Sequence, residues 1–299
     1  MTRHFLPMAI ALVFLSSCYS NRKAKVNKAI QQTTIQQEQE LASIGSLEKS
    51  KKEKLEAGKI DSTIDGKIMG NLGAHKSRID SVKKMMNDLT ASIKDPVTLR
   101  KSYKKIIKSK LVYLKADNLM FQKRIVNYGL IMDVLNNAKQ AQFDLATFFG
   151  PGEFVIPPDK MESARTAFTP IVDSMLQFAG YYPAISKNST IVLKGYADAT
   201  GIKAGTPLYY RLVNELKQNF ASNEELNLAI SKLRAASISD IVNSLVQKRQ
   251  PDFLQQQIVH IEVIQEGRGE EKPNPKIMDY TDNDPRRRIV LFFWTLLPV

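Results

Sequence analysis

The distribution of proline divides this chain into two parts. Apart from Pro7, the only proline before residue 150 is Pro96, and all the others lie from Pro151 onward. Proline lacks a backbone N–H and clashes with the preceding helical turn, so a long proline-poor segment is typical of helix. The sequence therefore predicts an α+β protein, with a helical N-terminal region followed by a domain of alternating helices and strands.

Two runs of residues, one on each side of Pro96, repeat at steps of four and three. This spacing puts one stripe on each helix and is typical of coiled-coil packing. Asp95 and Pro96 between them suit the cap and first turn of a new helix. We predict an antiparallel helical hairpin over residues 63–145, although pairing between two chains would give the same pattern. The runs are Ile68, Leu72, His75, Ile79, Val82, Met86, Leu89 and Ile93, then Ile107, Leu111, Leu114, Asn118, Phe121, Ile125, Tyr128, Met132 and Leu135.

A short apolar segment, residues 5–15, follows Arg3 near the N-terminus. Its 11 residues are too few to span a bilayer and have the composition of a signal peptide. The chain's single cysteine, Cys18, ends the sequence LSSC, which resembles the lipobox of bacterial lipoproteins. This resemblance implies a signal peptide at 1–17, a lipid on Cys18 and a polar tether at 18–62. An ordinary secretory signal is the alternative. Tyr19 replaces the aspartate that favours inner-membrane retention in enterobacterial-type sorting, so we expect the outer membrane.

The positive charge is concentrated in the N-terminal half. Residues 22–145 hold 25 Lys and Arg against 13 Asp and Glu, whereas residues 146–299 hold 17 of each. No aromatic platform or recognition motif accompanies the lysines, so they indicate an anionic membrane or wall polymer rather than nucleic acid. The three scattered histidines and the single cysteine lack metal-ligand spacing, so we expect no metal and no cofactor.

Residues 146–299 are predicted to contain strands at 190–197, 258–264 and 289–296 and helices at 169–179 and 226–246. Four motifs in this part resemble those of the OmpA-like, peptidoglycan-associated domain family. They are GYADATG at 195–201, NLAISKLRA at 227–235, GRGEEKP at 267–273 and RRRI at 286–289. The resemblance implies an OmpA-like α/β sandwich that binds peptidoglycan without cleaving it.

In this family the aspartate of the first motif and the arginine of the second hold diaminopimelate of the peptidoglycan stem peptide. The matching residues here are Asp198 and Arg234. A zwitterionic head group requires a carboxylate for its ammonium and a guanidinium for its carboxylate. Independently of the resemblance, Arg234 falls on the apolar arc of its predicted helix, where a charge needs a partner. We count Asn227 among the peptidoglycan-binding residues and expect it to brace the loop rather than to contact the ligand directly. We expect Arg287 and Arg288 to lie at the sheet edge rather than in the pocket.

Residues 202–226 form an insertion relative to the family pattern, and they include a predicted short amphipathic helix beside the pocket. Three functions remain open: an outer-membrane tether to peptidoglycan, an adaptor or stator-like subunit of an envelope machine, and an enzyme. The first two leave room for protein partners of the helical region. We expect no enzymatic activity, because His260 is the only histidine of the C-terminal domain and no catalytic motif accompanies it.

Overall fold

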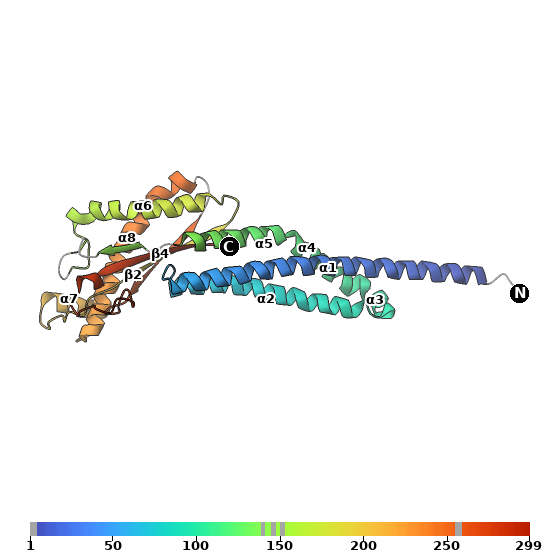
Figure 1. Cartoon of the computed structure of the whole chain (residues 1–299), viewed down its shortest axis with the longest axis horizontal. Coiled ribbons are helices and arrows are strands. Elements are labelled where there is room, and N and C mark those ends of the chain that lie inside the picture. The colour runs from blue at the N-terminus through green and yellow to red at the C-terminus, as the bar shows by residue number, and fades with distance from the viewer. Residues whose placement is uncertain (1–4, 139–140, 145–147, 150–152, 255–258) are drawn as a thin grey trace. The chain divides into compact units, whose positions relative to one another are not determined.

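The computed structural model describes residues 5–138, 141–144, 148–149, 153–254 and 259–299, with side chains described from residue 19. The chain forms two compact units, coloured along the sequence in Figure 1. The helical unit comprises Met1–Lys49 and Ile68–Gly129, and the sheet unit comprises Ser50–Lys67 and Leu130–Val299. A helical N-terminal region followed by a mixed sheet with helices confirms the α+β class.

The N-terminal half of the chain is helical almost throughout. Asp95 caps α3 by accepting the backbone N–H groups of Val97 and Thr98, with Pro96 at the first helical position. The predicted break between the two stripes is thereby confirmed. Within the described residues, no helix is long and apolar enough to cross a membrane. The helices are α1 Phe5–Glu56, α2 Ser62–Ser92, α3 Pro96–Ser102, a π-helical turn Tyr103–Ile107, α4 Lys108–Leu119 and α5 Phe121–Asn137.

The apolar core of the helical unit joins three parts of the chain. Val26 of α1 packs in one cluster with the last residues of the first run, Val82, Met86, Leu89 and Ile93, and with Leu99, Ile107 and Leu114. The tether expected at residues 18–62 is therefore, as far as Lys49, part of a packed unit. Besides these apolar contacts, polar pairs join α1 to its neighbours. One such pair joins the Thr33 hydroxyl to the Asn118 side-chain oxygen at 3.1 Å.

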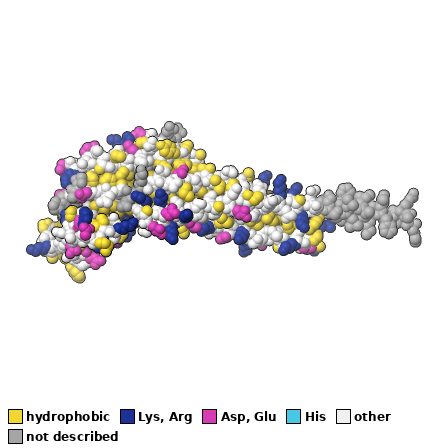
Figure 2. Space-filling view, in the orientation of Figure 1, with side chains coloured by type: hydrophobic (Ala, Val, Ile, Leu, Met, Phe, Trp, Pro, Cys, Tyr) yellow, Lys and Arg dark blue, Asp and Glu magenta, His cyan; other side chains and the backbone are white. Residues whose placement is uncertain are grey.

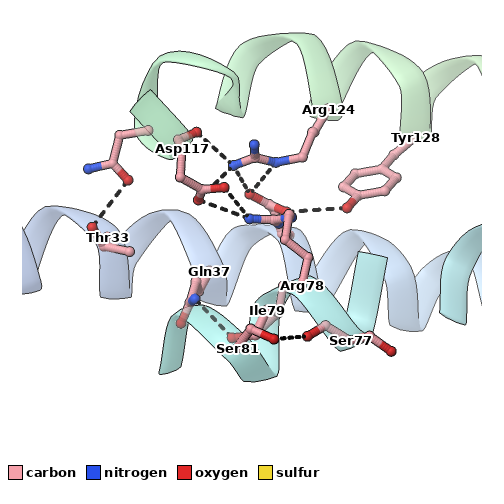
Figure 3. A network of polar contacts seen from close by, with 11 residues as sticks. Thr33, Gln37, Ser77, Arg78, Ile79, Ser81, Asp117, Arg124 and Tyr128 are labelled. Atoms are coloured by element: carbon pink, nitrogen blue, oxygen red, sulfur yellow. Dashed lines mark hydrogen bonds and ion pairs between the residues drawn. The ribbon is translucent and has the colours of Figure 1, made fainter. Parts of the chain in front are cut away.

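A buried ionic cluster holds α1, α2, α4 and α5 together (Figure 3). Glu40 of α1 accepts hydrogen bonds from the Arg124 Nε and Nη2 atoms at 2.9 and 2.8 Å, and pairs with Arg78. Arg78 Nη1 also donates to both carboxylate oxygens of Asp117, at 2.8 and 2.9 Å. The Tyr128 hydroxyl donates to Glu40 at 3.2 Å. The pKa of Tyr128 is raised, mainly by burial and next by the negative charge of Glu40. Two guanidinium groups therefore meet two carboxylates, and the cluster is neutral.

The described residues of the sheet unit form a four-stranded sheet in the order β1-β4-β2-β3. The central pair β2 and β4 is antiparallel, β3 runs parallel to β2, and β1 runs antiparallel to β4. Helices α6 and α8 pack together on one face (Figure 1), over a core that includes Phe168, Ile191 and Phe292. The elements are β1 Ala141–Asp144, α6 Met161–Gly180, β2 Lys187–Gly195, α7 Pro207–Leu216, α8 Asn223–Leu254, β3 His260–Gly267 and β4 Ile289–Pro298.

Two details differ from the sequence prediction. Helix α6 begins at Met161 and contains Pro170 within it, although the sequence predicted a start beside that proline. Buried Ala164 and Phe168 continue the apolar stripe upstream, and their packing outweighs the missing backbone hydrogen bond. Strand β1 lies within residues 63–145, which were predicted as helix, because Ala141–Asp144 carry no strand signal beyond Phe143.

Residues 61–67 rest on the sheet through ionic contacts. The Lys194 ammonium of β2 lies 3.0 Å from the Asp61 carboxylate and 3.5 Å from that of Glu266 in β3. Thr63 donates a hydrogen bond to Glu266 at 2.7 Å. Lys194 and Asp61 are both buried, so each charge needs the other. The first turn of α2 is therefore held against β2 and β3.

Candidate functional site

Two glycines bring the ends of β2 and β3 against the first turns of α8. A Cβ atom at Gly195 would lie 2.2 Å from the Ser231 carbonyl oxygen, and one at Gly267 would lie 2.7 Å from the Leu228 carbonyl oxygen. Only glycine allows such an approach. The Ser231 hydroxyl then accepts the Gly269 N–H at 2.9 Å. The loops after both strands are thus gathered around the beginning of α8, where the sequence predicted the binding site.

Asp198 lies in the loop after β2, and its carboxylate is already oriented by two partners. Its Oδ2 atom accepts hydrogen bonds from Arg288 Nε and Nη2 at 2.8 and 2.6 Å, and from the Thr200 hydroxyl at 2.7 Å. All of these bonds end on Oδ2. Among the described residues, no donor reaches Oδ1, so that oxygen is available to a ligand.

Arg234 projects from α8 and is only 8% exposed. Its Nε atom donates to the Glu153 carbonyl oxygen at 3.0 Å, and its guanidinium carbon lies 5.6 Å from the Phe149 ring centroid. Burial lowers the pKa of Arg234 to about 10, and the nearby charge of Asp198 partly offsets that effect. Within the described part of the chain, its terminal Nη atoms form no hydrogen bond and no ion pair. The charge of Asp198 thus acts on a buried cation whose two terminal nitrogens have no partner among the described residues.

Asn227 is 3% exposed and connects two loops of the site. Its side-chain amide donates to the Thr200 carbonyl oxygen at 3.3 Å and to the Glu270 carboxylate at 2.8 Å. These bonds tie the loop after β2 to the loop after β3. Both N–H bonds of this amide already donate within the protein. A direct contact of Asn227 with a ligand stays a prediction.

The three consecutive arginines before β4 have three different environments. Arg286 pairs with Asp284, and that guanidinium lowers the pKa of Asp284 to about 2. Arg287 is buried and donates to the carbonyl oxygens of Thr281 and Glu270. The expectation that Arg288 lies away from the pocket was wrong, because it pairs with Asp198. The two residues are 90 positions apart, and only the register of β4 beside β2 brings them together.

The insertion at 202–226 forms a helix beside the same site. Helix α7 begins after Thr206, whose hydroxyl accepts the Tyr209 N–H, and ends at Lys217 in the left-handed conformation with φ 53°. Its apolar side packs with Phe154, Ala197 and the start of α8. The Arg211 guanidinium carbon lies 4.4 Å from the Phe154 ring centroid. Since Ala197 precedes Asp198 directly, the insertion supports the loop that carries the site.

No family model matches the chain, and no curated protein matches its sequence. Solved structures similar to it include a MotB-like protein from Desulfovibrio vulgaris, at 16% identity over 52% of this chain and 73% of that one, with a TM-score of 0.29. Another is the periplasmic domain of Helicobacter pylori MotB, at 14% identity over 52% of this chain and 81% of that one, with a TM-score of 0.30. The functional assignment of the site therefore rests on its own residues and geometry.

Proposed function

We propose that this chain is a non-catalytic protein of the cell envelope whose sheet unit binds the stem peptide of peptidoglycan through diaminopimelate. One observation carries this proposal: among the described residues, nothing bonds to the terminal nitrogens of the buried Arg234 or to the Oδ1 atom of nearby Asp198. A buried arginine without a carboxylate partner is costly in a purely structural role. A ligand that carries both an amino and a carboxylate group would complete both residues at once.

The roles of the residues follow from their positions. Arg234 would bind the ligand carboxylate through two parallel hydrogen bonds, since its Nε atom is already used by the backbone. Asp198 would accept the ligand ammonium on Oδ1 while Arg288 holds Oδ2 in place. Asn227 keeps the two loops together. Because Arg288 neutralises part of the charge of Asp198, the site favours a zwitterion over a simple cation.

The direct test is binding of the purified chain to isolated sacculi, with diaminopimelate as competitor. Asp198→Asn and Arg234→Lys each remove part of the ligand contact with little change in volume. Charge-assisted hydrogen bonds contribute about 1.5–3 kcal/mol each, so affinity should fall roughly tenfold or more. The double variant should lose less binding free energy than the sum of the two single losses, because both residues hold the same zwitterionic head group.

A matched control exists in the same unit. Arg249 and Asp173 form an ion pair between the same two residue types elsewhere in the unit, with Nε and Nη2 at 2.8 and 2.7 Å from the two carboxylate oxygens. Asp173→Asn and Arg249→Lys should leave sacculus binding unchanged. Wild-type affinity in the folded Asp198→Asn and Arg234→Lys variants would reject the proposal.

The attachment to the membrane is a second part of the proposal. Cys18 ends a lipobox-like sequence, and we propose that it carries the lipid that holds the protein at the outer membrane, facing the periplasm. Labelled fatty acid should enter the wild-type chain and be absent from Cys18→Ala, which should be released from membranes at high salt or accumulate as precursor. Equal labelling of the two chains would show that Cys18 is not the lipidated residue.

The adaptor alternative, in which the same domain anchors an envelope machine, is favoured by one observation. Large apolar side chains of the helical unit are exposed near the junction of α4 and α5, among them Leu119 at 73% and Val126 at 52%. Exposed apolar surface of this kind marks protein interfaces. Co-purification of partners that is lost in Leu119→Ser/Val126→Ser, with sacculus binding intact, would identify this role.

A further inference from the structure

One end of the helical unit carries a high density of unneutralised positive charge. We call this surface the basic end and define it as residues 19–28 of α1 and residues 94–115. Residues 22–28 contain four Lys or Arg and no acid, and residues 94–115 contain eight, with Asp95 as the single acid. Asp95 is engaged in capping α3. Among the described residues, only one of these cations forms an ion pair, Lys110 with Asp88 at 2.7 Å.

The two basic segments are far apart in the sequence but adjacent in the fold. The Tyr19 hydroxyl donates to the Ile93 carbonyl oxygen at 3.3 Å. The Arg22 guanidinium carbon lies 4.7 Å from the Tyr103 ring centroid, and Val26 packs in one cluster with Leu99 and its neighbours. Figure 2 shows Lys and Arg side chains at the end of the helical unit that carries α3. The two basic segments therefore lie together at the same end of the helical unit.

Apolar side chains and grooves are interleaved with these charges. Val97, Ile106 and Val112 are more than half exposed, at 56, 51 and 61%. A groove of about 730 Å³ is lined by Tyr19, Arg22, Pro96, Val97, Leu99, Arg100 and Lys101. A second, of about 410 Å³, is lined by Lys25, Lys28, Ala29, Gln32, Leu111, Lys115, Asn118 and Leu119. Each groove thus combines cations with an apolar floor.

We propose that the basic end binds the head groups of anionic phospholipids at a membrane surface. Its cations match the phosphate groups, and its exposed apolar side chains match the region just below the head groups. A wall polysaccharide would satisfy the charges but would offer nothing to Val97, Ile106 and Val112. Tyr19, which lines the first groove, directly follows Cys18, so a lipid on that cysteine would bring the same surface to the membrane. The binding itself does not require the lipid.

The test uses the full chain with Cys18→Ala, so that no covalent lipid contributes. Its sedimentation with phosphatidylcholine vesicles is compared with that of vesicles that also contain phosphatidylglycerol, at low and high salt. The residues that precede Tyr19 are the same in every variant, so they contribute equally throughout. We expect phosphatidylglycerol to increase binding and salt to reverse the increase.

A charge-reversed variant locates the effect. Lys104, Lys105 and Lys108 are all exposed, so Lys104→Glu/Lys105→Glu/Lys108→Glu should reduce the phosphatidylglycerol-dependent binding roughly tenfold or more. The control Lys203→Glu/Lys272→Glu/Lys276→Glu makes the same change of charge at exposed positions of the sheet unit and should bind as the parent does. Circular dichroism verifies that both variants remain helical.

The outcomes separate this proposal from peptidoglycan binding. The basic-end variant should still bind sacculi, and Asp198→Asn should still bind vesicles. Equal binding to both kinds of vesicle, or equal losses in the two charge-reversed variants, would overturn the proposal. A basic-end variant that loses sacculi but keeps vesicles would overturn it as well, because the surface would then meet the wall.

Discussion

Two buried arginines of this chain have the same exposure, 8%, and opposite surroundings. Arg124 of the helical unit donates to Glu40 and to Asp117, and a second arginine completes a neutral cluster. Arg234 of the sheet unit has one bond to a backbone carbonyl oxygen and an aromatic ring beside it. The burial is equal, but only the first charge is satisfied by neighbours within the described part of the chain.

This difference separates a structural charge from a charge suited to a ligand. A neutral, fully bonded cluster specifies how helices meet, and removing one member leaves another charge buried without a partner. An unsatisfied guanidinium lowers stability while the site is empty, and recovers that loss when a carboxylate binds. Burial alone therefore does not distinguish a structural arginine from one suited to bind a ligand. The hydrogen-bond acceptors around its guanidinium do.

The largest expected effect comes from breaking the satisfied cluster. Arg124→Met should destabilise the helical unit by about 3–5 kcal/mol, because Glu40, at 1% exposed, loses the cation bonded to its Oε1. Thermal unfolding and hydrogen exchange of the helical segments would measure the loss. Sacculus binding by the remaining folded protein should not change.

A second substitution in the same background sharpens this result. Glu40→Met added to Arg124→Met removes both charges and leaves Arg78 paired with Asp117. The double variant should regain much of the lost stability, because no unpaired charge remains. If it is no more stable than the single variant, packing rather than charge explains the loss.

The same substitution at the other arginine should give the reverse pattern. Arg234→Met should leave the melting temperature unchanged or raise it, since it removes a buried charge whose pKa burial has already lowered to about 10. Sacculus binding should fall roughly tenfold or more. A large loss of stability in Arg234→Met would mean that this arginine is a structural residue, with the same role as Arg124.

The sequence predicted those features that depend on local pattern. The break at Pro96, the stripe of α2 and the position of Arg234 on the apolar arc of α8 each follow from spacing within one segment. The motif glycines at 195 and 267 also mark positions that only glycine allows, although the sequence could not say what they approach.

The features that the sequence did not predict depend on partners far along the chain. Glu40 and Arg78 stand among polar residues and look like solvated positions until α1 and α2 meet across them. The pairing of Arg288 with Asp198 requires the register of β2 and β4. Residues 18–62 read as a tether because they include few apolar residues, and the packing that buries Val26 is supplied by α2 to α4.

The smallest expected effect concerns the turn that positions Arg288. Asp284 caps this turn and pairs with Arg286, which lowers its pKa from 3.8 to about 2. Because the folded pKa is depressed, the stability from Asp284 is present above about pH 4 and is lost as the pH falls toward 2. Asp284→Asn should therefore melt below the wild type at pH 7, and the two should converge near pH 2. Asp240→Asn, at an exposed position of α8, is the control and should match the wild type at every pH.

Sacculus binding of Asp284→Asn should weaken only slightly, because Arg288 keeps its partner while the turn before it loosens. If Asp284→Asn instead loses as much binding as Asp198→Asn, the turn Pro285–Arg287 takes a direct part in binding. The ligand ammonium would then be accepted by a residue near Asp198 rather than by Asp198 itself.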